Sequence, residues 1–324
     1  FRAGVNAGNS ILSGSNFNVA VGDEAGTAIT LGDRNVAIGY SALKTEDTAN
    51  NNTAVGTNAL ATQNAGDVTS YNTAVGDSAM YGLTDGVYNT AVGGLALDAT
   101  VTGDENTSIG YQSMSTSTSG SDNVAVGAGA LYTNTTSNYQ TALGYQALYS
   151  SITTSVNADA YTTAVGYRAG YANTTGVRNT IVGAFALDAV VTGNDNTAVG
   201  YAALGANTSG TLNTAVGQGA LILNTQGGNN VAVGNDAAAA VATVSNVTAI
   251  GYAALATNTV DYNVAVGSRA LNTNGTGAKN TAVGTTALRY NDGGSFNTAV
   301  GFEALNANNS AANNTAVGYL ALKS

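Results

Sequence analysis

The chain has 324 residues without cysteine or histidine, and charged side chains make up only 9% of it. This composition excludes disulfides, metal sites built from thiolates or imidazoles, and His-dependent catalysis. The formal net charge of −10, with only nine Lys plus Arg, leaves little to neutralise a phosphate backbone, so we expect no nucleic-acid binding.

One nine-residue motif returns from Asn18 to Leu322, and residues 196–204 read Asn-Thr-Ala-Val-Gly-Tyr-Ala-Ala-Leu. Numbered from the Asn, its positions are Asn; Thr or Val; Ala; Val or Ile; Gly; two variable residues; Ala; and Leu or Met. The Gly at position five recurs at steps of 17 residues over most of the chain, as from Gly200 to Gly217. Such a period is typical of repeat architectures. It predicts a single elongated domain, residues 1–324, which we interpret as a section of a longer fibre.

The first strand of each repeat is expected at positions two to five, which places strands at 19–22, 36–39, 53–56 and onward to 315–318. The Gly and the two variable residues form a bend, and the Ala and Leu begin a return strand. A later Gly, such as Gly103, Gly193 or Gly210, marks a second bend through a positive φ. Each repeat is therefore expected to be a coil of two strands and two turns.

Two steps are longer than the rest, from Gly56 to Gly76 and from Gly144 to Gly166. The extra residues fall between one motif Leu and the next Asn. They predict loop insertions near residues 61–71 and 149–161. Variable loops on a rigid scaffold are common binding sites, and a tolerated insertion is the alternative interpretation.

Stacked coils would put equivalent strands in parallel at about 4.8 Å. The predicted fold class is an all-β parallel β-solenoid with two-strand rungs of about 17 residues. The Asn at position one is expected to stack as an amide ladder, interrupted at Gln140, Thr162 and Val247. A six-residue left-handed helix is the fold-level alternative, but its coil needs 18 residues.

The residues at position four are predicted to form the structural core of the repeat. Neither side of the first strand carries charge, so both sides are expected to be covered, one by the return strand and the other by identical chains. This arrangement predicts a homo-oligomer. The predicted core residues are Val55, Val75, Val92, Val126, Val165, Val199, Val216, Val283, Val300 and Val317.

The motif in residues 213–221 and 314–322 resembles the head repeats of trimeric autotransporter adhesins (YadA-like) and is similar to repeats in some bacteriophage tail fibres. The resemblance covers essentially the whole chain, although the period is longer than is usual in that family. It implies a left-handed parallel β-roll, a homotrimer on a cell surface or virion, and attachment to a host-cell, matrix or glycan ligand. A single-chain solenoid that binds ice through a Thr array is another hypothesis, and a glycan-cleaving spike is a third.

Aromatic residues recur directly after the motif Gly, and these could stack on sugar rings or simply on each other. The candidate ligand-binding residues are Tyr111, Tyr145, Tyr167, Tyr201 and Tyr252 after the Gly, with Tyr149 and Tyr161 beside the second insertion. Acidic bends at residues 103–106 and 193–196 offer oxygen ligands to calcium, but solvated turns are the simpler interpretation. We expect no metal, cofactor or catalytic activity, and no membrane insertion by this section.

Overall fold

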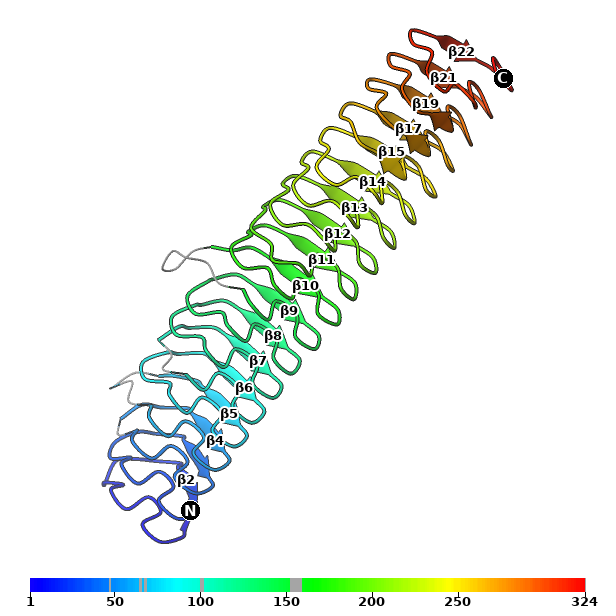
Figure 1. Cartoon of the computed structure of the whole chain (residues 1–324). Helices are drawn as coiled ribbons and strands as arrows, with labels where there is room; N and C mark the ends of the chain where they lie inside the picture. Colours follow the sequence, from blue (N-terminus) through cyan, green and yellow to red (C-terminus); the bar gives the residue numbers. More distant parts are fainter. Residues whose placement is uncertain (47, 64–65, 67–68, 100–101, 152–158, 324) are drawn as a thin grey trace. The chain divides into compact units, whose positions relative to one another are not determined.

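The structure, a computed structural model, describes all residues except 47, 64–65, 67–68, 100–101, 152–158 and 324. The chain divides into two compact units, residues 1–162 and 163–324. Each unit is a stack of coils with short parallel strands in the same order as the sequence (Figure 1). No helix occurs among the described residues.

In the first unit, one short strand recurs in each coil. The strands are β1 (Arg2–Ala3), β2 (Val19–Val21), β3 (Val36–Ile38), β4 (Thr53–Val55), β5 (Thr73–Val75), β6 (Thr90–Val92), β7 (Thr107–Ile109), β8 (Val124–Val126) and β9 (Thr141–Leu143).

The second unit repeats the pattern with β10 (Thr163–Val165), β11 (Thr180–Val182), β12 (Thr197–Val199), β13 (Thr214–Val216), β14 (Val231–Val233), β15 (Thr248–Ile250), β17 (Val264–Val266), β19 (Thr281–Val283), β21 (Thr298–Val300) and β22 (Thr315–Val317). A second, smaller sheet contains β16 (Thr257–Asn258), β18 (Thr273–Asn274) and β20 (Tyr290–Asn291).

Neighbouring strands pair in parallel, and motif positions meet their equivalents. Thr197 pairs with Thr214, Ala198 with Ala215 and Val199 with Val216. Because each partner lies one repeat further along the chain, the period of the sequence becomes the turn of the coil. The prediction of a parallel β-solenoid with coils of about 17 residues is confirmed.

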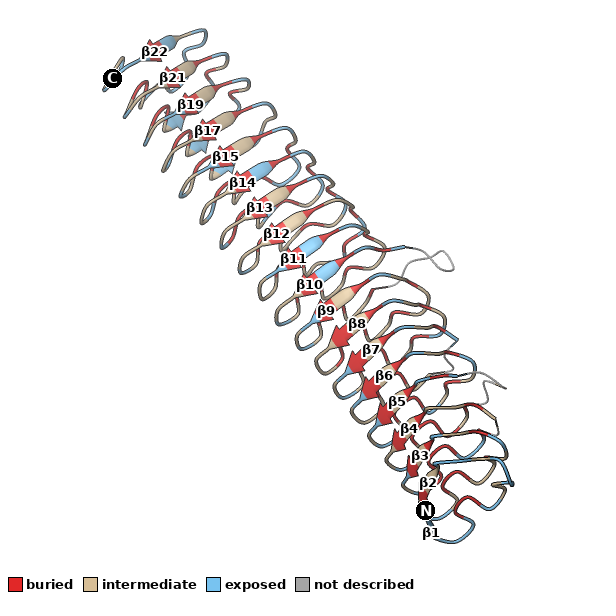
Figure 2. Ribbon diagram, turned by 180° about the vertical axis from the view of Figure 1, so that it is seen from behind, coloured by how far each residue is buried: buried red, intermediate tan, exposed pale blue. Residues whose placement is uncertain are grey.

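The strand's small residue, not its valine, points into the coil. Ala198 and Ala215 are fully buried, whereas Val182 is 37% exposed and Val283 is 36% exposed. Buried and more exposed residues accordingly alternate along the strands in Figure 2. Within one chain, the predicted valine core is therefore wrong. The interior of so short a coil is narrow, so the strand contributes alanine to it while the branched side chains face outward.

This correction applies to the predicted core valines in both units, whose side chains lie on the outer face of the strands and are half-exposed or exposed: Val55, Val75, Val92, Val126, Val165, Val199, Val216, Val283, Val300 and Val317.

The return half of most coils is a series of turns instead of a second strand. Ala202 and Leu204, at motif positions seven and nine, have φ values of 53° and 53°, in the left-handed region. Leu204 is nevertheless fully buried. Because every second residue here is left-handed, the chain turns around the interior and forms no regular return strand. Short strands occur in this half only in the coils that hold β16, β18 and β20.

The two kinds of glycine have different roles, and the position-five Gly lies at the bend where it was expected. Gly200, at position five, has a φ of 137°, and a Cβ there would lie 2.5 Å from the carbonyl oxygen of Gly217. The later glycines Gly103, Gly193 and Gly210 do not have a left-handed φ. They are needed because a Cβ would collide with the backbone of the next coil. The prediction of a positive φ at this second set is wrong.

Candidate binding surfaces

The asparagines at motif position one form a buried ladder along the coils. The backbone N–H of Asn213 donates to Oδ1 of Asn196 over 3.1 Å, and that of Asn196 donates to Oδ1 of Asn179 over 2.9 Å. The side-chain Nδ2 of Asn196 donates to the carbonyl oxygen of Gly210 over 2.9 Å. The predicted ladder is confirmed, and it satisfies buried polar groups at the entry to each strand.

The ladder responds in different ways to two of its predicted interruptions. Gln140 still donates its backbone N–H to Asn123 over 3.0 Å, and its Oε1 accepts a bond of 2.7 Å from the hydroxyl of Ser151. Val247 donates its N–H to Asn230 over 3.1 Å but has no side-chain acceptor to offer the next coil. The ladder therefore stops at Val247 and starts again with Asn263, whose Oδ1 accepts from Asn280.

A second row of buried asparagines, three residues after the motif Leu, was not predicted. Asn291 donates its Nδ2 to Oδ1 of Asn274 over 2.7 Å, and Asn274 donates to Asn258 over 2.6 Å. Asn263 of the first ladder donates to Asn258 over 3.1 Å, which links the two rows. The recurrence of Asn after the motif Leu was the signal that could have found this row. Both rows are internal and offer no binding surface.

The residue directly before the motif Asn forms an exposed row, which we call the pre-Asn row. Its members have left-handed φ values, such as 60° at Tyr88, 58° at Glu105, 59° at Asp122 and 57° at Tyr139. In these four consecutive coils the N–H of the residue also donates to a carbonyl of the preceding coil, as Tyr88 does to Ser70 over 2.7 Å and Tyr139 does to Ser121 over 3.3 Å. Because the backbone conformation and the bond repeat, the side chains project from equivalent places on successive coils.

Aromatic side chains in the pre-Asn row stack in pairs in the first unit. The ring centroids of Tyr71 and Tyr88 are 5.6 Å apart, and those of Tyr139 and Tyr161 are 5.1 Å apart with an interplanar angle of 2°. These four side chains are 45–55% exposed. Tyr161 also donates its hydroxyl to Asp159 over 3.0 Å, a bond that raises the pKa of the phenol. Of the predicted candidates, only Tyr161 belongs to this row.

The other predicted tyrosines lie elsewhere. Tyr111, Tyr145, Tyr167, Tyr201 and Tyr252 are exposed residues just beyond the strand, on a different part of the coil from the pre-Asn row.

Several of these tyrosines contact other side chains. Phe185 lies between Tyr167 and Tyr201, with centroid distances of 5.2 Å and 5.9 Å in edge-to-face geometry. Arg269 lies over the ring of Tyr252 at 5.4 Å. Tyr149 stacks on Tyr132 with centroids 4.9 Å apart. The rings support one another along the coils, and their role in ligand binding stays a prediction.

The second unit fills its pre-Asn row differently. Arg178 forms a two-pronged ion pair with Asp195, with N–O distances of 2.6 and 2.8 Å. The guanidinium lowers the pKa of the Asp195 carboxyl through this hydrogen bond. Lys279 lies 5.3 Å from the ring centre of Phe296. Charges in this row of the second unit are thus matched by neighbours one coil away.

The acidic bends considered for calcium are occupied with hydrogen bonds to the backbone. Oδ1 of Asp104 accepts from the N–H of Val87 over 2.8 Å, and Oδ1 of Asn194 accepts from Val177 over 2.9 Å. Across the described residues, no three acidic side chains converge as a metal site would require.

The predicted insertions are described only in part, because residues 64–65, 67–68 and 152–158 lie outside the described residues. At the first insertion, Nδ2 of Asn52 and Oε1 of Gln63 are buried and have no hydrogen-bond partner among the described residues. In regular coils the same Nδ2 atom donates to the carbonyl 14 residues further on, as Asn196 does. The ladder bond itself continues here, because Oδ1 of Asn52 accepts from the N–H of Asn72 over 3.1 Å.

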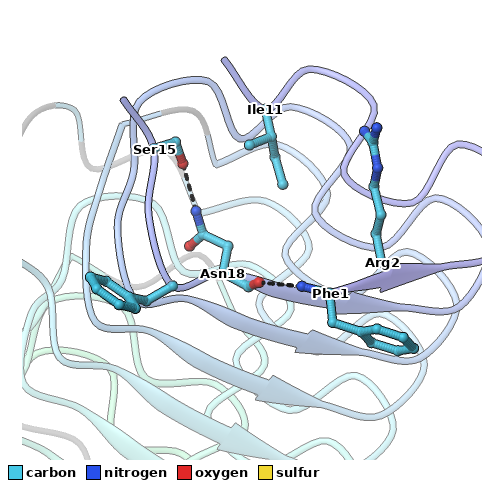
Figure 3. A pocket seen from close by; sticks show the side chains of 6 residues that line it. Phe1, Arg2, Ile11, Ser15 and Asn18 are labelled. Atoms are coloured by element: carbon cyan, nitrogen blue, oxygen red, sulfur yellow. Dashed lines mark hydrogen bonds between the residues drawn. The ribbon is translucent and has the colours of Figure 1, made fainter. Parts of the chain in front are cut away.

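A cavity of about 330 Å³ opens at the first coil and is lined by Phe1, Arg2, Ile11, Ser15, Phe17 and Asn18 (Figure 3). The amide of Asn18 donates to Ser15 over 2.6 Å. The Asn18 carbonyl accepts a 3.1 Å bond from the amino group of Phe1, and Arg2 donates to the carbonyl of Gly8 over 3.0 Å. In coils further along, the equivalents of Asn18, such as Asn35 and Asn52, are fully buried.

No protein-family model matches the chain, and no curated protein matches its sequence. A search of the described residues for an apolar helix of membrane-spanning length found none.

Proposed function

We propose that this chain is a section of an extracellular fibre in which three identical left-handed rolls pack side by side. The observation that carries the proposal is the outer face of the strands. From β2 onward no strand contains a charged residue, and the outward Val, Ile and Leu side chains recur in every coil. A long apolar and uncharged sheet face is typical of a surface covered by another chain.

The magnitudes favour association along the whole face. Full burial of a Val side chain contributes about 1.5–3 kcal/mol, so completing the burial of a half-exposed one contributes about 1 kcal/mol. Association costs roughly 4–15 kcal/mol in lost freedom, which a few coils could not offset. Completing the burial of the ten outward aliphatic residues of the second unit would contribute a free energy of the same order as this cost. Repeating coils suit this mode because every coil of one copy meets an equivalent coil of the next.

The resemblance to adhesin head repeats supports attachment to a host-cell, matrix or glycan surface as the role of the fibre, without a catalytic step. A bacteriophage tail fibre for host recognition would use the same assembly. A single-chain ice-binding solenoid is a second candidate, because residues such as Thr197 and Thr214 face outward in register on the same sheet. A thermal-hysteresis assay separates it from the fibre.

The assembly is tested by multi-angle light scattering of the whole chain, for which we expect three times the chain mass. The double variant Val199→Glu/Val216→Glu places charge on β12 and β13 and should shift the mass toward one chain. Leu223→Glu is the control, since Leu223 is 52% exposed and lies outside the strand face. A wild-type chain that stays monomeric at all concentrations contradicts the proposal.

A further inference from the structure

The net negative charge of the molecule comes from one unit. Residues 1–162 contain 13 of the 19 acidic and three of the nine basic residues, a formal charge of 3 − 13 = −10. Residues 163–324 contain six of each, a formal charge of 6 − 6 = 0. Between residues 45 and 162 there is no Lys or Arg at all. Such an asymmetry attracts cationic partners to the first unit and repels acidic ones.

The pre-Asn row of this unit has a regular order of side chains. After Phe17, Arg34 and Asn51, the row continues in consecutive coils with Tyr71 and Tyr88, then Glu105 and Asp122, and then Tyr139 and Tyr161. Glu105 and Asp122 are exposed, and neither carboxylate forms an ion pair or side-chain hydrogen bond with the described residues. Their counterpart in the second unit, Asp195, is paired with Arg178.

The left-handed backbone conformation of this row disfavours the bulky side chains that occupy it. A left-handed φ costs a residue other than Gly or Asn roughly 1–2 kcal/mol. Other coils place Asn here, at Asn51, Asn229, Asn246 and Asn313, with φ values of 58–62°. Stacking of the paired tyrosines contributes about 0.5–1.5 kcal/mol, which offsets part of that cost without favouring Tyr over Asn. The tyrosines therefore supply something besides stability.

We propose that Tyr88, Glu105, Asp122 and Tyr139 form a binding surface for a linear polysaccharide of amino sugars. The two carboxylates pair with protonated amino groups, and the tyrosines on either side contact the apolar faces of the flanking sugar rings. Tyr71 and Tyr161 hold these rings in place by stacking on them. The inference rests on the adhesive part of the proposed function and names its ligand class; it does not need the association of copies.

Spacing favours a polysaccharide over a basic peptide. The row advances by about 4.8 Å per coil, the distance between paired strands. An extended peptide presents side chains on one face every two residues, at roughly 6.6 Å, and falls out of step with the row. In a β-1,4-linked chain of glucosamine, each ring advances the polymer by close to one coil spacing, and the amino groups of successive rings lie on opposite edges of the chain. Successive sugars can then meet successive coils.

The test is calorimetric titration of the whole chain with a β-1,4-linked glucosamine hexamer, in mildly acidic buffer of low ionic strength. The N-acetylated hexamer and a lysine hexamer serve as comparison ligands. We expect the glucosamine hexamer to bind at least about tenfold more tightly than either, with an affinity that falls as salt is added. Equal binding of the N-acetylated hexamer would overturn the role of the carboxylates, and tighter binding of the lysine hexamer would make the ligand a peptide.

The variants are chosen to preserve the fold. Tyr88→Asn/Tyr139→Asn introduces the residue that other coils carry at the same φ, and it should weaken binding about tenfold. Tyr262→Asn is its control in the second unit and should have no effect.

Asp122→Asn should weaken binding two- to fivefold, as expected for an exposed charge pair. Asp77→Asn, which changes the formal charge of the same unit equally at an exposed position away from the row, should not. Equal effects of the two substitutions would mean that the ligand is attracted only by the net charge of the unit, and this would overturn the site.

Light scattering in the same buffer separates this inference from the proposed assembly. Trimers that do not bind the glucosamine hexamer would refute the site and leave the fibre proposal standing. A monomeric chain that binds the glucosamine hexamer would refute the trimer and leave the binding site standing.

Discussion

At the scale of single residues, the interior of the coil is specified by matched small side chains. Motif positions three and eight are usually both Ala, as in Ala198 and Ala203, and both are fully buried. One coil has Ser108 and Ser113 at these places. Their hydroxyls lie 2.6 Å apart, and Ser108 also bonds to the carbonyl of Ser113 over 2.9 Å. A polar pair thus replaces an apolar pair within the same space.

This pairing predicts strong coupling in a double-mutant cycle. Ser108→Ala alone should destabilise the fold by about 1–3 kcal/mol, because it leaves a buried hydroxyl with fewer partners. The double variant Ser108→Ala/Ser113→Ala should be close to wild type, since it recreates the apolar pair of the other coils. Denaturant unfolding monitored by circular dichroism measures both. Additive losses in the double variant would refute the coupling.

At the scale of the coil, glycine at position five allows neighbouring turns to approach. Gly200→Ala should destabilise the fold by at least about 2–3 kcal/mol, because a φ of 137° suits only Gly and the added Cβ meets the carbonyl of Gly217. Gly293→Ala is the matched control in the same unit. Gly293 does not have a left-handed φ, and a Cβ there would lie 3.6 Å from Oγ1 of Thr276, the nearest atom outside the adjoining residues. Thermal unfolding that shows equal losses for the two variants would contradict this account.

Much of the coil could be predicted from the sequence, because the period and the β-branched run fix a parallel stack. The position-one Asn ladder followed from the recurrence of Asn at the strand entry. The sequence did not show which face of the strand points into the coil. Alternation separates Ala198 from Val199, but only the width of the interior decides which one points inward. The left-handed residues at Leu204 and Tyr88 were also missed, because neither is a residue type that favours that conformation.

At the scale of the whole molecule, each coil bonds to its neighbours through equivalent atoms. Removing one full period should therefore preserve every remaining contact pattern. Deletion of residues 197–213 joins Asn196 to Thr214 and leaves the motif intact, so we expect a folded protein of slightly lower stability. Deletion of residues 197–204 breaks the period and should disrupt pairing in the second unit. Circular dichroism and limited proteolysis compare the two, and equal folding of both would refute the dependence on period.

The candidate binding surface was predictable only in part at this scale. The sequence drew attention to the tyrosines after the motif Gly, yet the row beside Glu105 and Asp122 emerges once the coils are aligned by the position-one Asn. Insertions shift the sequence distances within the row, so Tyr139 and Tyr161 stack although they are 22 residues apart. Their common left-handed φ, 57° at Tyr139 and 45° at Tyr161, places both in the row, and this conformation is not visible in composition.

The equivalence of bonds from coil to coil also bears on how such a gene can change. Repeated coding segments can recombine out of alignment, which gains or loses whole periods at once. A coil gained or lost in this way brings its own acceptors and donors with it and leaves the two flanking surfaces complementary. Length can then vary between generations while the fold persists, and the row of tyrosines and carboxylates can be lengthened, shortened or erased in a single genetic event.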